Sequence, residues 1–116
     1  MTKYGAVPTE VDGHRFPSRR EAARYQELRL LESAEWPDAI RNLRLQVTHR
    51  LVVNGVLVCK YISDFEYDEQ SRLHVPPRST VEWLSVVEDC KGFKTKEYRL
   101  KAKLLLALEG TTIRET

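Results

Sequence analysis

The sequence predicts a single α/β domain in which a central mixed sheet is flanked by helices, in the order helix, three strands, helix, strand. Three features carry this prediction. Two stretches place apolar residues at helical spacing, an Asn-Gly pair separates two alternating stretches rich in β-branched residues, and a third apolar run follows them. With 116 residues, the chain has the length of one domain, and we expect residues 1–116 to share one fold.

The N-terminal third is predicted to form a small hairpin or loop followed by a helix. An Asp-Gly pair favours a turn within residues 1–17. Ser18 and Glu21 have the S-x-x-E spacing of a capping box, in which the hydroxyl accepts from the N3 amide and the carboxylate reaches back. The helix is expected over residues 19–34, before Pro37 stops it.

Three strands are predicted next. Residues 43–53 alternate, and an Asn-Gly pair then favours a type I′ turn into a return strand over residues 56–67. The polar residues 68–80, which include two consecutive prolines, are predicted to form a loop. The apolar run at residues 81–90 predicts a third strand, placed centrally and beside the return strand.

The C-terminal part predicts a second helix and a short strand. Thr95 is a favourable N-cap, leucines form one stripe over residues 96–109, and Gly110 provides the stop. The tail TTIRE is expected to add one short edge strand.

Composition excludes several classes of protein. Hydrophobic residues make up 41% and charged residues 31%, a balance typical of globular domains and not of disordered or fibrous chains. The sequence contains no run of about 18 apolar residues, and its first fifteen residues contain no apolar signal region. We therefore expect a cytoplasmic protein with no membrane partner. The three histidines lack metal-ligand spacing and are expected at the surface.

Charged side chains interrupt two otherwise apolar strands. Asp64 lies within YISDFEY, and Asp89 and Lys91 end the run WLSVVEDCK. Because strand side chains alternate, Asp89 and Lys91 share a face, whereas Glu88 faces away and is interpreted as structural. If the two strands are neighbours, Asp64, Asp89 and Lys91 converge.

Such a group suits metal-assisted phosphodiester hydrolysis. Adjacent carboxylates repel each other unless a cation or a proton lies between them, and hard oxygen ligands suit Mg²⁺ or Mn²⁺. The metal would polarise a phosphoryl oxygen and lower the pKa of a water, while Lys91 would stabilise the attacking hydroxide or the phosphorane. The alternative is a solvated strand end in which Lys91 only pairs with Asp89. The D-x-K pattern by itself leaves both open.

The order of elements resembles the αβββαβ core of the PD-(D/E)XK nuclease superfamily, which carries one acid on its second strand and (D/E)-x-K on its third. Asp64 and Asp89-Cys90-Lys91 occupy those places. A closer resemblance is to a family of small phage and prophage proteins classed as a domain of unknown function (DUF1064). Motifs similar to those of the family stand at Lys3–Ala6, Thr9–Gly13, Phe16–Leu31, Tyr61–Tyr67 and Val87–Thr95. Residues 68–80 depart from the pattern and are interpreted as an inserted loop.

The resemblance implies a Mg²⁺-dependent DNA endonuclease, with Mn²⁺ as a substitute, that is phage-encoded and acts in the host cytoplasm on duplex or branched DNA. It further implies that the Cys90 carbonyl is a metal ligand. Glu21 matches a first-helix glutamate that completes the metal site in archaeal Holliday-junction resolvases and related nucleases. The capping box gives Glu21 a competing role, and one carboxylate cannot perform both.

Lys94, Lys96 and Arg99 are the candidates for DNA-phosphate contacts because they directly follow the third strand. They belong to the basic stretch KGFKTKEYRLKAK at residues 91–103, which forms either a phosphate-facing patch or a solvated helix face. A four-way junction has two-fold symmetry, so a resolvase-like enzyme is expected to act as a homodimer.

Two other classes of function stay open. A non-catalytic DNA-binding or DNA-packaging accessory module on the same fold would be free to lose Lys91, so the intact set of Asp64, Asp89 and Lys91 argues against it. A protein-interaction domain with an incidental D-x-K would bind no Mg²⁺ and cleave no DNA.

Overall fold

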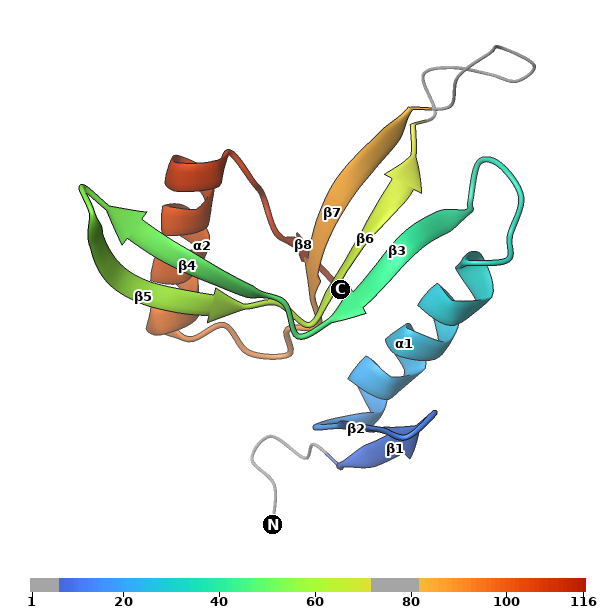
Figure 1. The fold of residues 1–116 in the computed structure, drawn as a ribbon. Coiled ribbons are helices and arrows are strands. Elements are labelled where there is room, and N and C mark those ends of the chain that lie inside the picture. Colours follow the sequence, from blue (N-terminus) through green and yellow to red (C-terminus); the bar gives the residue numbers. More distant parts are fainter. Residues whose placement is uncertain (1–6, 72–81) are drawn as a thin grey trace.

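The computed structural model describes residues 7–71 and 82–116 and contains two helices and eight strands in that part of the chain (Figure 1). In chain order these are β1 (Thr9–Val11), β2 (His14–Phe16), α1 (Arg19–Leu31), β3 (Ile40–Leu45), β4 (Thr48–Val53), β5 (Val56–Ile62), β6 (Phe65–Gln70), β7 (Trp83–Asp89), α2 (Lys96–Glu109) and β8 (Arg114–Glu115). The predicted α/β class with two helices is confirmed. The expected motif at Lys3–Ala6 and most of the expected loop at residues 68–80 lie outside the described residues.

The central sheet has the strand order β3-β6-β7-β8. Its first three strands are antiparallel, and β8 joins β7 in parallel, so the sheet is mixed. The third predicted strand lies beside the return strand, as expected, with Glu88 opposite Phe65. β6 continues to Gln70 instead of ending at residue 67, because Asp68, Glu69 and Gln70 pair with β7.

The prediction of two continuous strands at residues 43–53 and 56–67 was wrong. Each stretch is two strands, of which β3 and β6 belong to the central sheet and β4 and β5 form a separate hairpin. The first stretch breaks at Gln46, whose φ of 53° lies in the left-handed region, and the second breaks at Ser63 and Asp64. Two backbone hydrogen bonds join the breaks, from Gln46 N–H to Asp64 O at 3.2 Å and from Ser63 N–H to Val47 O at 2.9 Å.

Both predicted dipeptide turns are present. Asn54 and Gly55 have φ values of 50° and 80°, as a type I′ turn requires, and join β4 to β5. An equivalent Asp-Gly turn joins β1 to β2. α2 begins after Thr95, whose hydroxyl accepts from Tyr98 N–H at 3.0 Å, and ends at Gly110 with a φ of 69°, as predicted.

The first helix ends at Leu31, three residues before the predicted residue 34. Ser33 N–H donates to Leu30 O and Ala34 N–H donates to Leu31 O, each three residues back along the chain. These tighter bonds satisfy terminal carbonyls without continuing the α-helix, so the chain leaves the helix before it reaches Pro37.

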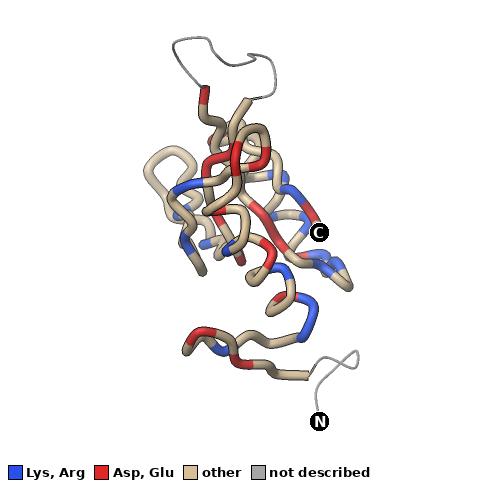
Figure 2. The backbone as a smooth tube through the Cα atoms, turned by 90° about the vertical axis from the view of Figure 1, so that its right-hand side faces the viewer, with Lys and Arg blue, Asp and Glu red and all other residues tan. Residues whose placement is uncertain are grey.

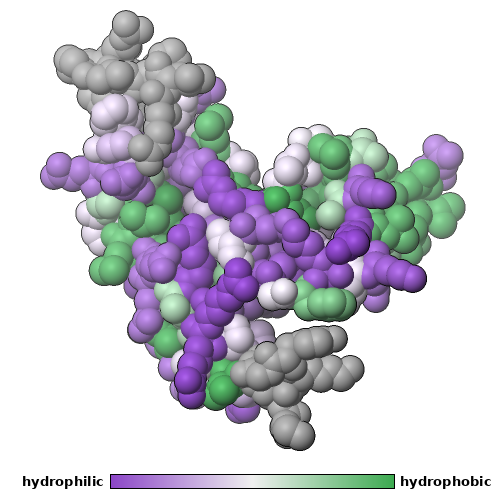
Figure 3. All heavy atoms as spheres, turned by 180° about the vertical axis from the view of Figure 1, so that it is seen from behind, coloured by the Kyte–Doolittle hydropathy of each residue, from purple (hydrophilic) through white to green (hydrophobic). Residues whose placement is uncertain are grey.

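Two apolar cores occupy opposite faces of the central sheet. The first cluster joins α1 and β2 to the sheet and consists of Phe16, Ala22, Tyr25, Leu28, Ile40, Phe65, Tyr67 and Val86. The second joins the β4–β5 hairpin and α2 to β7 and consists of Leu51, Tyr61, Val87, Tyr98 and Leu105. Consecutive residues of β7, Val86 and Val87, thus enter different cores, as strand alternation requires. In the view from behind, apolar atoms gather on the side of the hairpin and α2, while the middle of the molecule is hydrophilic (Figure 3).

We expect each core to be needed for stability. Leu28 and Leu105 are fully buried in the first and second core, so truncating either to Ala should lower the free energy of unfolding by about 2–5 kcal/mol. Leu30→Ala and Leu106→Ala are matched controls on the same helices, because these side chains are 75% and 51% exposed and should change it by roughly 0.5 kcal/mol or less. Urea denaturation of the four variants measures the difference. Equal losses for buried and exposed leucines would contradict this packing.

Candidate active site

Asp64 lies at the break between β5 and β6, and Asp89 is the last residue of β7. The hairpin and the central sheet diverge at this break (Figure 1). Asp64 N–H donates to Asp89 Oδ1 at 3.0 Å, and Cys90 N–H donates to Asp64 Oδ2 at 2.9 Å. Each acid is therefore held by a backbone amide of the other's segment. The structure brings the two predicted acids together and places the Cys90 peptide beside them.

Glu21 joins the two aspartates from the first turn of α1. Ser18 Oγ accepts from Glu21 N–H at 3.2 Å, which is one half of the expected capping box. The Glu21 side chain, however, is close enough to Asp64, Asp89 and Lys91 for these groups to affect its pKa. Glu21 is only 5% exposed and Asp89 is fully buried, whereas Asp64 is half-buried, so the three carboxylates come from three segments and are largely shielded from solvent.

Lys91 provides a cation at this site. Its Nζ lies 3.8 Å from Asp89 Oδ2 and 4.6 Å from the ring centroid of Tyr98. The backbone around it is fixed by the C-terminal strand, because Lys91 N–H donates to Thr116 O and Thr116 N–H donates to Asp89 O. Asp89 and Lys91 thus share a face, as strand alternation predicts.

Tyr61 is a member of the site that the sequence analysis missed. Its hydroxyl donates to Asp89 Oδ2, and its ring belongs to the second core. Burial and the Asp89 carboxylate raise the pKa of Tyr61, so it stays a hydrogen-bond donor at neutral pH. No local signal in the sequence indicated this contact, because it forms only when the β4–β5 hairpin packs on β7.

The pKa values of all three acids are raised, in each case chiefly by burial. Burial, and then the charge of Asp64, raise the pKa of Asp89 to about 6, against the opposing hydrogen bond from Tyr61. Burial and the charge of Glu21 also raise the pKa of Asp64, and burial raises that of Glu21. Proximity of like charges in a desolvated site produces this effect, and a bound cation would relieve it.

The donor set is made of hard oxygens, which suits Mg²⁺. Within residues 7–71 and 82–116, however, no three His, Cys, Asp or Glu side chains are grouped as ligands of one metal ion. Asp64 Oδ2 and both Asp89 oxygens already accept hydrogen bonds from Cys90, Asp64 and Tyr61. A cation at this site has to share or displace those donors.

Glu88 faces the opposite side of β7, as predicted, and is fully buried there. It accepts from Arg24 Nε and Nη2 at 2.7 and 3.0 Å, from Tyr67 Oη at 2.5 Å and from Thr116 Oγ1 at 3.1 Å. Burial opposes ionisation, but the hydrogen bonds from Arg24 and Tyr67 hold the pKa of Glu88 below its ordinary value. The negative charge of Glu88 is therefore balanced by Arg24, and the residue has a structural role.

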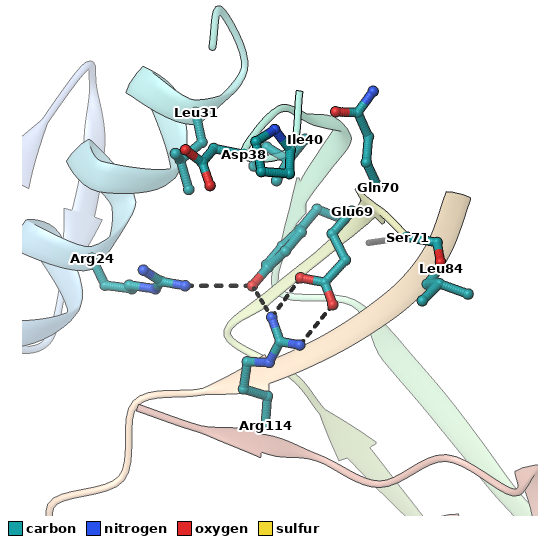
Figure 4. Close-up of a pocket in the computed structure, with 11 residues that line it drawn as sticks. Arg24, Leu31, Asp38, Ile40, Glu69, Gln70, Ser71, Leu84 and Arg114 are labelled. Atoms are coloured by element: carbon teal, nitrogen blue, oxygen red, sulfur yellow. Dashed lines mark hydrogen bonds and ion pairs between the residues drawn. The ribbon is translucent and has the colours of Figure 1, made fainter. Parts of the chain in front are cut away.

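A pocket of about 480 Å³ lies on the Glu88 side of the sheet (Figure 4). Two of its lining cations are engaged: Arg114 forms a two-pronged pair with Glu69 at 2.8 Å, and Arg24 binds Glu88. Both arginines also donate to the hydroxyl of Tyr67. This pocket is thus built around an ion-pair network that ties α1, β6, β7 and β8 together, on the face away from Asp89.

The predicted phosphate-contacting residues lie at the start of α2 and just before it. Lys94 Nζ pairs with Glu115 Oε1 at 2.8 Å, and Lys96 and Arg99 are exposed on the helix. Lys96 is two residues from the buried Tyr98, which places it on the solvent side of α2. Along the described backbone, acidic and basic residues are intermingled (Figure 2).

The prediction that the histidines lie at the surface was wrong for His49, whose side chain is only 13% exposed. Its Nε2 bonds to Glu66 and its Nδ1 lies 3.1 Å from Glu109, while Ser63 Oγ also donates to Glu66 at 2.8 Å. Burial opposes protonation, but these two carboxylates raise the pKa of His49 overall. Because Glu66 and Glu109 are distant from His49 in sequence, spacing could not indicate this bridge between hairpin, sheet and α2.

The raised pKa of Asp89 predicts a pH-dependent loss of stability. Between pH 3.8 and about 6 the folded protein keeps a proton that the unfolded chain releases, so stability falls as pH rises and the loss is complete above pH 6. The rise in pKa corresponds to roughly 3 kcal/mol. Asp89→Asn should therefore gain stability relative to wild type between pH 4 and pH 7, measured by urea denaturation. Parallel pH profiles for the two proteins would contradict the prediction, and Glu10→Gln on β1 serves as the control.

Comparison with known proteins identifies the family. The chain matches the model described as Protein of unknown function (DUF1064) over residues 1–109. No curated protein and no solved structure matches it significantly. In the part of the chain that the structure describes, no helix is long and apolar enough to cross a membrane. Because the family model spans nearly the whole chain and includes Glu21, Asp64, Asp89 and Lys91, this protein belongs to the DUF1064 family.

Proposed function

We propose that this protein is a Mg²⁺-dependent DNA endonuclease of the PD-(D/E)XK type. The observation that carries the proposal is the approach of three carboxylates, the buried Glu21 and Asp89 and the half-buried Asp64, to one another and to Lys91. Three acids against one lysine leave the site with excess negative charge. Glu88, by contrast, has its own arginine. An under-compensated buried acidic group is costly for stability and is typical of a site that binds a cation.

In this proposal Asp64, Asp89 and Glu21 hold the metal, with the Cys90 carbonyl as a further ligand. The fit rests on the oxygen donors and on the raised pKa values of the acids, because both favour a hard divalent cation. Mn²⁺ has similar ligand preferences and is expected to substitute. Mg²⁺ bound there supplies a Lewis acid for the phosphoryl oxygen and the attacking water.

The side chains of the protein position the reacting groups and stabilise the transition state. Water oxygen attacks phosphorus, the bond to the 3′ oxygen breaks, and that oxygen leaves and takes up a proton, giving 5′-phosphate and 3′-hydroxyl ends. Lys91, held between Asp89 and the Tyr98 ring, offsets the charge that develops on the phosphorane. Tyr61 fixes the Asp89 carboxylate by a hydrogen bond.

The narrower proposal is a phage-encoded enzyme for branched DNA, acting as a homodimer in the host cytoplasm. It rests on the resemblance to resolvases and on the symmetry of a four-way junction. Lys94, Lys96 and Arg99 are the proposed backbone contacts, of which Lys96 and Arg99 are exposed on α2. The alternative is a DNA-binding or packaging module, which would retain these contacts without cleavage.

Metal binding tests the acid cluster separately from DNA. Isothermal titration with Mn²⁺ at pH 7.5 should show binding to wild type, and Asp64→Asn or Glu21→Gln should each weaken it by about tenfold or more, because each removes a charged ligand. Asp68→Asn is the matched control on β6, where the carboxylate pairs with Arg41 and Asn42 instead. Unchanged affinity in Asp64→Asn would place the metal elsewhere.

Cleavage assays test the activity itself. Plasmid, linear duplex, flap and four-way-junction DNA should be incubated with wild type in Mg²⁺ or in EDTA, and we expect cleavage only in Mg²⁺. Lys91→Ala should lower the single-turnover rate by roughly 10²-fold, since one preorganised electrostatic donor is lost in the transition state. DNA affinity in Ca²⁺ should change little. DNA binding without cleavage of any of these substrates would support the accessory-module alternative.

A further inference from the structure

A second pocket, of about 260 Å³, lies between β5 and the first turns of α2. It is lined by Lys60, Tyr61, Ile62, Lys91, Thr95, Glu97, Tyr98 and Lys101. Two of these residues also contact the acid cluster: Tyr61 bonds to Asp89, and Lys91 Nζ lies 3.8 Å from it. The pocket is therefore separated from the candidate active site by the thickness of two side chains.

The pocket lining is positively charged. Three lysines, Lys60, Lys91 and Lys101, face a single acid, Glu97. Glu97 compensates weakly, because its side chain is 76% exposed and pairs with Lys101 at 3.0 Å along the helix surface. Lys91 lies 3.8 Å from Asp89 and Lys101 pairs with Glu97, so among the described residues Lys60 is the lysine of this lining whose charge an anionic ligand would compensate most.

The size and lining of the pocket narrow the class of anion. Its volume lies below the roughly 300–1,000 Å³ of typical small-molecule sites, so it accommodates only part of a larger ligand. Ile62 is 52% exposed beside the lysines, and the Tyr98 ring supplies a second apolar surface. The lysines can contact a phosphate, and the neighbouring Ile62 and Tyr98 can contact a sugar. This pairing matches the repeating sugar-phosphate unit of a nucleic-acid backbone.

The sequence run of basic residues does not coincide with this pocket. Lys101 lines it, whereas Lys103, two residues further on, is rotated by about 200° and is exposed. Lys60 is far from that run in sequence and enters from β5. If the pocket binds the anion, Lys60 and Lys101 should contribute to binding and Lys103 should not. If the whole basic stretch acts as a uniform patch, Lys101 and Lys103 should contribute equally.

We propose that this pocket binds a backbone phosphate of the DNA strand next to the phosphate that is cleaved, with Lys60 and Lys101 as its cationic contacts. This inference rests on the proposed function for its substrate class and adds where the strand runs, from the acid cluster across Tyr61 into the cleft between β5 and α2. Lys91, which lines the pocket and contacts Asp89, lies at the boundary between the two phosphate positions.

The test is equilibrium binding of a fluorescent 20-base-pair duplex in Ca²⁺, over a series of salt concentrations. Lys60→Gln with Lys101→Gln should weaken binding by about tenfold or more and reduce the log-log salt slope by roughly 0.9 per lost contact. Glu97→Gln should instead strengthen binding several-fold, because it removes the acid that opposes the phosphate. Lys103→Gln is the matched control and should change affinity by less than about threefold.

Thermal melting of each variant separates misfolding from lost contacts, and Glu97→Gln keeps the test decisive because damage to the fold cannot tighten binding. Equal effects of Lys101→Gln and Lys103→Gln, or weaker binding by Glu97→Gln, would overturn the pocket in favour of a diffuse basic surface. Inorganic phosphate is titrated in a separate arm. If the lysine variants lose phosphate binding but keep DNA affinity, the ligand is a free anion and the proposal is wrong.

The two proposals fail differently. If the wild type cleaves DNA and the lysine variants bind DNA with unchanged affinity, the proposed nuclease function stands and the proposed phosphate pocket is wrong. If the same variants bind DNA more weakly but the wild type cleaves no DNA, the pocket stands as a contact for the DNA backbone and the proposed nuclease activity is wrong.

Discussion

The arrangement of this protein depends on a reciprocal pair of hydrogen bonds in which each of two aspartates, the half-buried Asp64 and the buried Asp89, is held by a backbone amide of the other's segment. Asp64 N–H binds Asp89, and Cys90 N–H binds Asp64. These bonds fasten the break between β5 and β6 to the end of β7, where the two apolar cores meet the turn out of the sheet. The same bonds that define the fold therefore also fix the positions of the two acids.

Strand alternation at the end of β7 gives two neighbouring acids opposite environments. Glu88 enters the side of α1, where Arg24 and Tyr67 hold it ionised and its pKa low. Asp89 enters the side of α2, where burial and Asp64 raise its pKa to about 6. Only the second environment is left poorly compensated. That contrast, within one dipeptide, is the strongest physical reason to separate Glu88 as a structural acid from Asp89, which we propose as a cation ligand.

Local signals in the sequence predicted much of this. Caps and turns are local chemistry, so the bounds of α2 and the Asn-Gly turn followed from a few residues. The strand breaks did not, because nothing local in Ser63 or Gln46 shows that one strand will serve two sheets. For the same reason spacing gave the shared face of Asp89 and Lys91 but not the Tyr61 hydroxyl that caps Asp89, since that contact requires the hairpin to pack on β7.

The placement of charge suggests how one site can accept both a cation and a polyanion. In the proposed function the carboxylates would repel DNA, but Glu21 and Asp89 are buried and Asp64 is half-buried, while the lysines of the second pocket are half-buried or exposed beside them. Lys91 lies between the two regions and screens one from the other. A cation on the acids would reduce the repulsion that a neighbouring phosphate meets, and the phosphate would in turn favour the cation, so the two ligands should bind with positive coupling. This reciprocity follows from geometry and charge, because the acids and the pocket share the Tyr61 and Lys91 side chains as their common wall.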